Sequence, residues 1–172
     1  SNDLYIFAPK IYKDERGYFY EKFNQLSFRD VVGSNLNLFQ ENESFSFHGT
    51  LRGLHYQAHN PQGKLISVID GEILDVVVDL RESSSTFGQH FSLKINSTDK
   101  ELLWIPKGYA HGFLVLSKSV IFSYLVDNFY DKKSEQTILW NDPDLNIDWG
   151  IENPIVSKKD SQGIKFSEAI YF

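Results

Sequence analysis

Short segments in which apolar and polar residues alternate follow one another along most of this chain. Such alternation places successive side chains on opposite faces of a strand, and regularly spaced strands of this kind are typical of a β-sandwich or barrel. We therefore predict an all-β fold. The strands are expected at residues 38–47, 51–57, 64–69, 73–80, 90–96, 102–105, 112–116 and 120–126.

Turn residues mark how these segments connect. Asp70-Gly71 lies between two apolar runs, a pattern that predicts a tight hairpin. A short peripheral helix is predicted over residues 27–32, with Ser27 as its N-cap and Gly33 as a left-handed stop. From residue 142 onward, proline and small polar residues replace the alternation, so we expect irregular loops with short helical turns that wrap the sheet.

The composition excludes several classes of protein. A length of 172 residues suits one domain, expected over 1–172, and is short for two. The chain has no cysteine, no apolar run of membrane-spanning length and no secretory signal at its start, so we expect a cytoplasmic protein without a membrane partner. A net charge of −6 argues against general nucleic-acid binding, so an anionic ligand needs a local cluster of cations.

Residues 51–57 combine a fixed cation, an imidazole and an amide in one predicted strand. Regular alternation puts His55 and Gln57 on one face, looking into a barrel, and Arg52 on the other. Taken alone, His55 also fits a partly buried histidine with a satisfied hydrogen bond. A metal site needs two or three converging ligands, and His59 lies past the strand end. An acid or base role without a metal is therefore better supported.

Another group of candidate residues surrounds residues 104–113. Glycines flank Ala110-His111 and allow a close approach of the backbone, so His111 is expected where a strand begins. An exposed turn histidine is the alternative. Lys64 follows Gly63 at the start of another strand, and Tyr124 lies in the last one.

Seven motifs follow one another along the chain. They are Asp14-Glu15-Arg16-Gly17-Tyr18-Phe19, Leu51 to Gln57, Gly63-Lys64-Leu65, Asp75 to Arg81, Ser85-Thr86-Phe87-Gly88, Trp104-Ile105-Pro106 with His111-Gly112-Phe113, and Ser157-Lys158-Lys159-Asp160. In this order they resemble the dTDP-4-dehydrorhamnose 3,5-epimerase family. The resemblance covers nearly the whole chain and implies a cupin-type jelly-roll β-barrel, a homodimer, no metal or other cofactor, and a dTDP-linked 4-keto-6-deoxy sugar as substrate.

The resemblance also implies roles for individual residues. His55 matches the general base and Asp160 the carboxylate that orients it, while Lys64 matches a cation near the ketone oxygen and Tyr124 the proton donor on the opposite face. Substrate contacts are implied for a further set: Arg16, Glu21, Gln40, Asn42, Arg52, Gln57, His111, Phe129, Glu135 and Lys159. Tyr18, Phe19 and Phe129 fit either stacking on the base or ordinary packing.

The implied reaction inverts carbons 3 and 5 of the sugar, in the biosynthesis of a rhamnose-type deoxysugar or a surface polysaccharide. Three alternatives remain open: a single-centre epimerase, a non-catalytic sugar-nucleotide binding module and a metal-dependent cupin. The chain departs from the common family pattern at Glu43, Leu125 and Gly150. Glu43 and Leu125 are expected beside the site, where they would influence which carbon is inverted.

Overall fold

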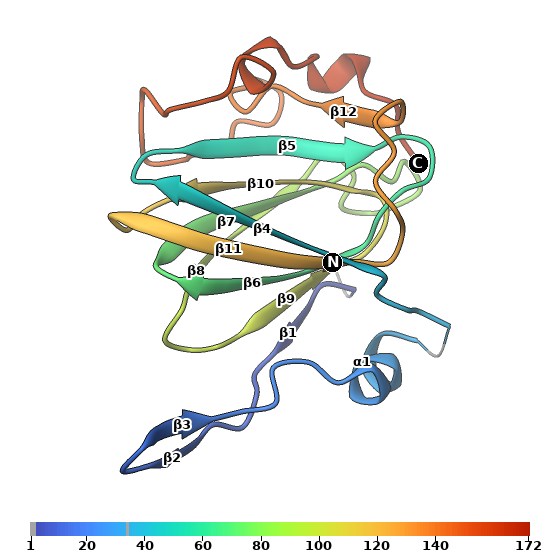
Figure 1. Ribbon diagram of the computed structural model, residues 1–172. Coiled ribbons are helices and arrows are strands. Elements are labelled where there is room, and N and C mark those ends of the chain that lie inside the picture. The colour runs from blue at the N-terminus through green and yellow to red at the C-terminus, as the bar shows by residue number, and fades with distance from the viewer. Residues whose placement is uncertain (1–2, 34) are drawn as a thin grey trace.

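The computed structural model describes residues 3–33 and 35–172, and its main body is two antiparallel five-stranded sheets that face each other (Figure 1). The first sheet has the order β1 (Tyr5–Phe7), β9 (Leu102–Ile105), β6 (Lys64–Asp70), β11 (Ser119–Val126) and β4 (Gln40–Phe47). The second has the order β12 (Glu135–Thr137), β5 (Leu51–Gln57), β10 (Tyr109–Val115), β7 (Glu72–Asp79) and β8 (His90–Asn96). The all-β prediction is confirmed, and every predicted strand is present. No helix among the described residues is long and apolar enough to cross a membrane.

The space between the two sheets is filled by apolar side chains that alternate along each strand. On β7, Ile73 and Val77 point into this interior, whereas Val76 and Val78 belong to a different cluster on the outer face. The interior cluster takes residues from both sheets, including Ile66, Phe113 and Phe122. A sheet pair with covered outer faces and a filled interior is the arrangement of a jelly-roll barrel.

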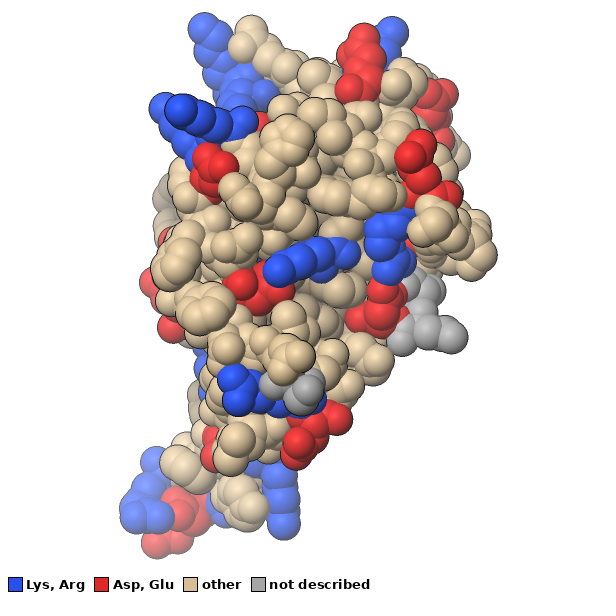
Figure 2. Space-filling view, turned by 90° about the vertical axis from the view of Figure 1, so that its right-hand side faces the viewer, with Lys and Arg blue, Asp and Glu red and all other residues tan. Residues whose placement is uncertain are grey.

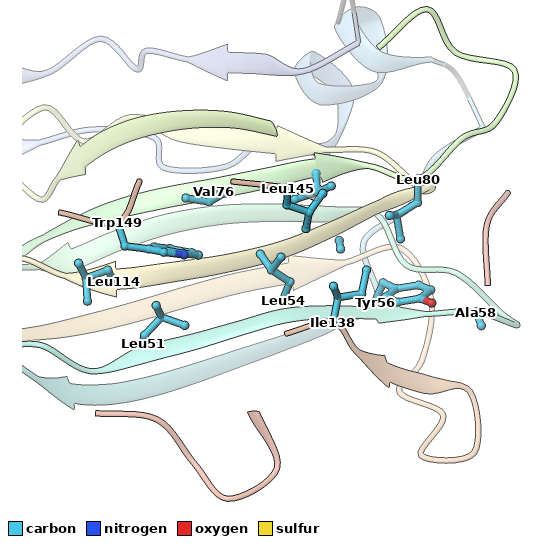
Figure 3. Packing of buried hydrophobic residues seen from close by; sticks show 12 residues of the cluster. Leu51, Leu54, Tyr56, Ala58, Val76, Leu80, Leu114, Ile138, Leu145 and Trp149 are labelled. Carbon is cyan, nitrogen blue, oxygen red and sulfur yellow. The ribbon is translucent and has the colours of Figure 1, made fainter. Parts of the chain in front are cut away.

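Each outer face carries its own apolar cluster. The chain that follows β12 folds back over the second sheet and buries residues such as Leu54, Tyr56 and Trp149 (Figure 3). This part contains two short 3₁₀ turns, η1 (Asp160–Gln162) and η2 (Phe166–Glu168), which confirms the prediction of irregular loops with helical turns. The wrapping places η1 against β5, and so brings the end of the chain to the barrel.

The helix prediction is right in place but wrong at its start. The helix α1 covers Gln25–Val32 and packs Phe28 against the outer face of the first sheet. Its N-cap is Asn24, whose side chain accepts hydrogen bonds from the backbone N–H groups of Leu26 and Ser27. Ser27 therefore lies inside the first turn and not at the cap, because an asparagine three residues earlier satisfies the same free amides.

The predicted hairpin at Asp70-Gly71 is wrong. The strands before and after it, β6 and β7, belong to different sheets and do not pair. Gly71 has a φ of +91°, and a Cβ there would lie 2.3 Å from the carbonyl oxygen of Ser119. The dipeptide thus makes a tight corner that packs against the start of β11 (Ser119–Val126). This corner leads the polypeptide from the first sheet, at the end of β6, into the second sheet, at the start of β7. A sequence that permits a sharp bend does not specify which strands then pair.

The N-terminal part forms an arm outside the barrel. The strands β2 (Tyr12–Asp14) and β3 (Gly17–Phe19) pair only with each other and project away from the two large sheets (Figure 1). The arm leaves Tyr18 and Phe19 exposed by 58% and 70%.

Candidate active site

The strand β5 does not alternate regularly, and this decides which of its side chains reach the interior. His55 is the register partner of His111 on β10, and Arg52 is the partner of Phe113. Arg52 and His55 are three residues apart on β5, whereas their partners are two residues apart on β10. One extra residue in one strand of a pair is the definition of a β-bulge. The extra residue reverses the face, so Arg52 and His55 line the same cavity. Regular alternation, which would put Arg52 and His55 on opposite faces, therefore does not hold along β5.

Two glycines make the bulge possible. Gly53 has a φ of +128°, and a Cβ there would lie 2.5 Å from the Cα of Gly112 and 2.8 Å from the carbonyl oxygen of His111. A Cβ on Gly112 would in turn lie 2.8 Å from the carbonyl oxygen of Arg52. The peptide bond between Gly53 and Leu54 is cis. Only a pair without side chains allows the two backbones to approach this closely.

A cavity of about 220 Å³ opens between the sheets at this point. Five strands, β5 and β10 from one sheet and β4, β6 and β11 from the other, contribute its polar groups, so residues far apart in sequence meet there. His55 and Tyr124 come from opposite sheets. The lining residues are Asn42, Glu43, Ser44, Arg52, His55, Lys64, His111, Phe113, Phe122 and Tyr124.

His55 is bound to a buried carboxylate. Its Nε2 lies 2.6 Å from Oδ1 of Asp160, and the side chains are 30% and 4% exposed. Burial pushes the pKa of Asp160 upward, but the hydrogen bond and charge of His55, with help from Ser157, outweigh it and leave the pKa below its usual value. An ionised carboxylate only accepts hydrogen bonds, so Nε2 carries the hydrogen and Nδ1 keeps a lone pair that can take a proton.

Lys64 supplies positive charge from the opposite sheet. Its Nζ lies 3.4 Å from the carbonyl oxygen of His55. Burial lowers the pKa of Lys64 to about 8, although the negative charges of Asp75 and Glu135 act in the other direction. A cation in a cavity poor in water interacts more strongly with a developing oxyanion than it would in solvent.

Tyr124 presents a phenol across the cavity from His55. Burial raises its pKa, and the charge of Glu135 raises it further, while the charge of Arg52 acts in the opposite direction. Its register partner on β4 is Asn42, which also lines the cavity. The raised pKa keeps the phenol protonated at neutral pH, as a proton donor requires.

His111 belongs to a second imidazole–carboxylate pair, which the sequence did not reveal. Its Nε2 lies 2.7 Å from Oδ2 of Asp75, and the side chains are 7% and 0% exposed. The only signal in the sequence was an acidic residue within an apolar strand. That signal is ambiguous, because Asp79 on the same strand instead binds Arg81 in the loop that follows.

The rim of the cavity carries a group of paired charges. Lys159 Nζ lies 2.5 Å from Oε1 of Glu135, whose Oε2 accepts a hydrogen bond from the hydroxyl of Tyr130 at 3.0 Å. A second hollow, of about 390 Å³, adjoins the cavity and shares Arg52 and His55 with it. Lys159 lines this hollow, so two cations border it.

Gln57, Gln40 and Phe129 are predicted substrate contacts that do not line the cavity. The amide of Gln57 is buried and binds two loops: it donates to the carbonyl of Asn60 and accepts from the N–H of Asp131, both at 2.7 Å. The amide of Gln57 therefore holds these two loops, and Gln57 is not among the residues that line the cavity with His55. Gln40 donates to Asn42 at 2.9 Å. Phe129 is 64% exposed and stacks on Phe39, with ring centroids 5.7 Å apart.

Arg16 and Glu21 are remote from the cavity within this chain. Arg16 sits at the tip of the arm, with its side chain 83% exposed, and pairs with Asp14. Glu21 is exposed and accepts a hydrogen bond from Asn24 at 3.2 Å. The sequence could not place these residues, because their distance from the cavity is a property of the whole fold.

The three residues that depart from the family pattern, Glu43, Leu125 and Gly150, lie in different parts of the structure. Glu43 lines the cavity, as expected. Leu125 does not lie beside the site, because its side chain packs on the outer face of the first sheet with Phe28 and Leu65. Gly150 is an exposed turn residue with a φ of +70° and open space around it.

Figure 2 shows how charged side chains are distributed over one face of the protein. Lysine and arginine side chains are interspersed with aspartate and glutamate there, without a continuous basic surface. Within residues 3–33 and 35–172, no three histidine, cysteine, aspartate or glutamate side chains are arranged to hold a metal ion.

An imidazole–carboxylate pair on one sheet and a phenol on the other suit proton removal from one face of a carbon and proton return to the other. The barrel and its cavity therefore define a cupin-fold isomerase. A family model described as dTDP-4-dehydrorhamnose 3,5-epimerase matches residues 2–168. The chain belongs to this family.

Individual relatives agree over nearly the full length. The chain is 48% identical to dTDP-4-dehydrorhamnose 3,5-epimerase of Shigella flexneri over 171 residues, which cover 99% of this chain and 94% of that protein. It superposes on the crystal structure of the Elizabethkingia anophelis enzyme of the same name with a TM-score of 0.92, 45% identity and coverage of 98% and 94%. A Legionella pneumophila dTDP-6-deoxy-D-glucose-3,5-epimerase in complex with dTDP-4-keto-L-rhamnose gives a TM-score of 0.93, 43% identity and coverage of 98% and 90%.

Proposed function

We propose that the protein inverts carbons 3 and 5 of dTDP-4-dehydro-6-deoxy-D-glucose to give dTDP-4-dehydro-L-rhamnose, for a deoxysugar or surface polysaccharide. The observation that carries this proposal is the placement of His55 and Tyr124 on opposite sheets across one cavity. The relatives named above support the double inversion, and a ligated relative contains the corresponding product. An inversion needs a base and an acid on opposite faces, because proton return from the side of removal restores the starting configuration.

The groups in the cavity account for each proton. Nδ1 of His55 takes the hydrogen from a carbon beside the ketone, and the electron pair of that bond moves onto the carbonyl oxygen as an enolate. Lys64 stabilises the enolate charge, and the hydroxyl of Tyr124 gives a proton to the opposite face of the same carbon. This leaves an imidazolium and a phenolate, which exchange protons with water before the second carbon reacts. Asp160 stabilises the imidazolium in the meantime.

Cations beside the cavity provide for the diphosphate. Arg52 faces the cavity, and its Nε donates to Ser46 Oγ at 2.9 Å, which fixes the guanidinium. Lys159 lines the adjoining hollow. Arginine suits bidentate binding of phosphate oxygens, so the two cations can hold a diphosphate although the protein as a whole is acidic.

Incubation with dTDP-4-keto-6-deoxyglucose in heavy water tests the function. NMR should show deuterium at both carbon 3 and carbon 5, together with the inverted product. Exchange at one carbon alone would favour a single-centre epimerase. Exchange at neither carbon would refute the proposal, and nucleotide binding without exchange would favour a binding module.

We further propose a homodimer in which the arm of one chain completes the cavity of the other. Arg16 and Glu21 resemble substrate-contacting residues of the family, but the arm holds them away from the cavity of their own chain. Phe45 and Phe47 on β4 also leave an apolar surface, exposed by 54% and 66%. A two-fold pair of chains would bury such a surface and exchange the arms.

We also propose that the protein needs no metal ion for activity and that it is located in the cytoplasm. Elemental analysis of the active protein should find no stoichiometric transition metal, and activity should survive a chelator. Loss of activity on chelation, restored by one metal, would favour a metal-dependent cupin. Cell fractionation tests the location.

A further inference from the structure

The pair formed by His111 and Asp75 has no part in the proton transfers at carbon. It nevertheless lies in the same cavity as His55, and His111 and His55 are register partners on neighbouring strands. Each imidazole uses Nε2 to bind a carboxylate, at 2.6 Å for His55 and 2.7 Å for His111. The cavity thus contains two imidazoles whose Nδ1 is the nitrogen left for a ligand.

The position of Asp75 is hard to explain by stability alone. Its side chain is fully buried on the interior face of β7, between Ile73 and Val77, which belong to the apolar core. Oδ1 of Asp75 has no hydrogen-bond partner among the described residues. A buried carboxylate with an unsatisfied oxygen is usually less stable than an apolar residue of similar size. Its contact with His111, which lines the polar cavity, points to a role in the cavity.

Asp75 acts on two groups that face the cavity. It binds Nε2 of His111 directly, and its negative charge favours the protonated form of Lys64 and so raises the pKa of that amine against the effect of burial. A carboxylate accepts hydrogen bonds and donates none when ionised. When His111 carries one hydrogen, that hydrogen is therefore on Nε2, and Nδ1 is left as a hydrogen-bond acceptor.

We propose that Asp75 is a positioning residue that fixes the tautomer of His111, so that Nδ1 accepts a hydrogen bond from a hydroxyl of the sugar. This inference rests on the proposed function. The contact orients the hexose between His55 and Tyr124. Lys64 donates from the other sheet, so the cavity offers one donor and one acceptor to neighbouring oxygens of the sugar. A sugar without that hydroxyl would leave the acceptor unpaired and bind more weakly.

The tautomer can be read without substrate. In protein labelled with ¹⁵N-histidine, two-bond ¹H–¹⁵N spectra should show the His111 hydrogen on Nε2, with the signals assigned by their loss in His111→Asn. In Asp75→Asn the amide can donate to Nε2, so the hydrogen should move towards Nδ1. A hydrogen on Nδ1 in the unchanged protein would overturn the proposal, and this measurement does not require the Asp75→Asn variant to fold.

Binding separates positioning from a purely structural role. In Asp75→Asn the dissociation constant of the dTDP-sugar should rise about 10-fold, the effect of one lost hydrogen bond, while that of dTDP alone stays within about twofold. Equal weakening of both ligands, or of neither in a folded variant, would contradict the proposal. Asp160→Asn is the matched control: it should lower kcat and leave the His111 tautomer unchanged. Failure of the proposed function would appear separately, as no deuterium exchange in the unchanged protein.

Discussion

At the scale of single residues, chemistry in the cavity depends on which ring nitrogen of each histidine remains available. Asp160 occupies Nε2 of His55 and leaves Nδ1 as the base. The carboxylate lies almost entirely out of solvent, so its interaction with a protonated imidazole is weakly screened by salt. His111 has a carboxylate partner as well, so the pair alone does not make a base; His55 also lies across the cavity from the hydroxyl of Tyr124.

Replacing His55 should therefore separate chemistry from binding. His55→Asn is expected to lower kcat by about 10² to 10⁴, the usual contribution of a positioned base, while the affinity for dTDP changes little. Steady-state kinetics and calorimetry measure the two quantities. His59→Asn is the matched control, because His59 is exposed on the loop after β5 and outside the cavity. Full activity of His55→Asn would refute the base assignment.

The lowered pKa of Lys64 predicts that activity is lost at alkaline pH. Its pKa is lowered to about 8, so the amine loses its charge, and the enolate its stabilisation, as the pH rises through that value. The phenol of Tyr124 has a raised pKa and stays protonated there. We expect kcat/KM to fall above about pH 8, and the limit to move upward in any active Lys64→Arg variant, because a guanidinium stays charged. An unchanged limit in an active variant would show that another group titrates.

The lowered pKa of Lys64 also makes the free energy of unfolding depend on pH. Between about pH 8 and the ordinary lysine value of 10.5, the unfolded chain binds a proton at Lys64 that the folded chain has released. The contribution of this group to the free energy of unfolding therefore increases with pH across that window. Activity and this part of stability should change in opposite directions there, as urea unfolding at several pH values can show.

At the scale of elements, the bulge in β5 is the device that assembles the site. It puts Arg52 and His55 on the same face, three residues apart, and turns Leu54 to the outer face. Without the extra residue, alternation would keep either Arg52 or His55 out of the cavity. The corner at Gly71 has a comparable role, because it lets one continuous run of residues serve both sheets.

A pair of glycine substitutions tests the bulge. Gly53 and Gly33 both have a φ of +128°, but a Cβ at Gly33 would meet nothing within 4 Å. Gly33→Ala should reduce the free energy of unfolding by about 1 to 3 kcal/mol through the backbone conformation alone. Gly53→Ala should lose about 1 to 3 kcal/mol more, because Gly112 obstructs the new methyl group. Urea unfolding measures the difference, and equal losses would mean that the close approach at Gly53 is unimportant.

At the scale of the whole molecule, one chain accounts for proton transfer but not for every expected substrate contact. The cavity holds the groups that act on the sugar, while Arg16 lies on an arm that points away from it (Figure 1). If the arms are exchanged in a dimer, each site consists of a barrel from one chain and an arm from the other.

A mixture of two inactive variants tests this arrangement. His55→Asn lacks the base and Arg16→Glu lacks the arm cation, so each should be impaired alone. After unfolding and refolding together in equal amounts, half of the dimers should be mixed, and each should contain one intact site, which restores about a quarter of the original activity. If mass spectrometry shows that mixed dimers have formed but no activity returns, Arg16 acts in the site of its own chain or outside the site.

The sequence by itself determined the β-class of the fold, the positions of the eight longer strands but not of the three-residue strands β1, β2, β3 and β12, and the residue types of the site. Strand periodicity and turn residues are local properties, and the ordered motifs around His55, Lys64 and His111 were specific enough to indicate the family. Only the tertiary structure decided which of those side chains face the cavity and which partners they bind. The bulge at Gly53 depends on close approach to Gly112 of a different strand, and the corner at Gly71 on the neighbouring β11. The partner of His111 and the amide contacts of Gln57 likewise come from strands and loops that meet only when the chain folds, which no local pattern encodes.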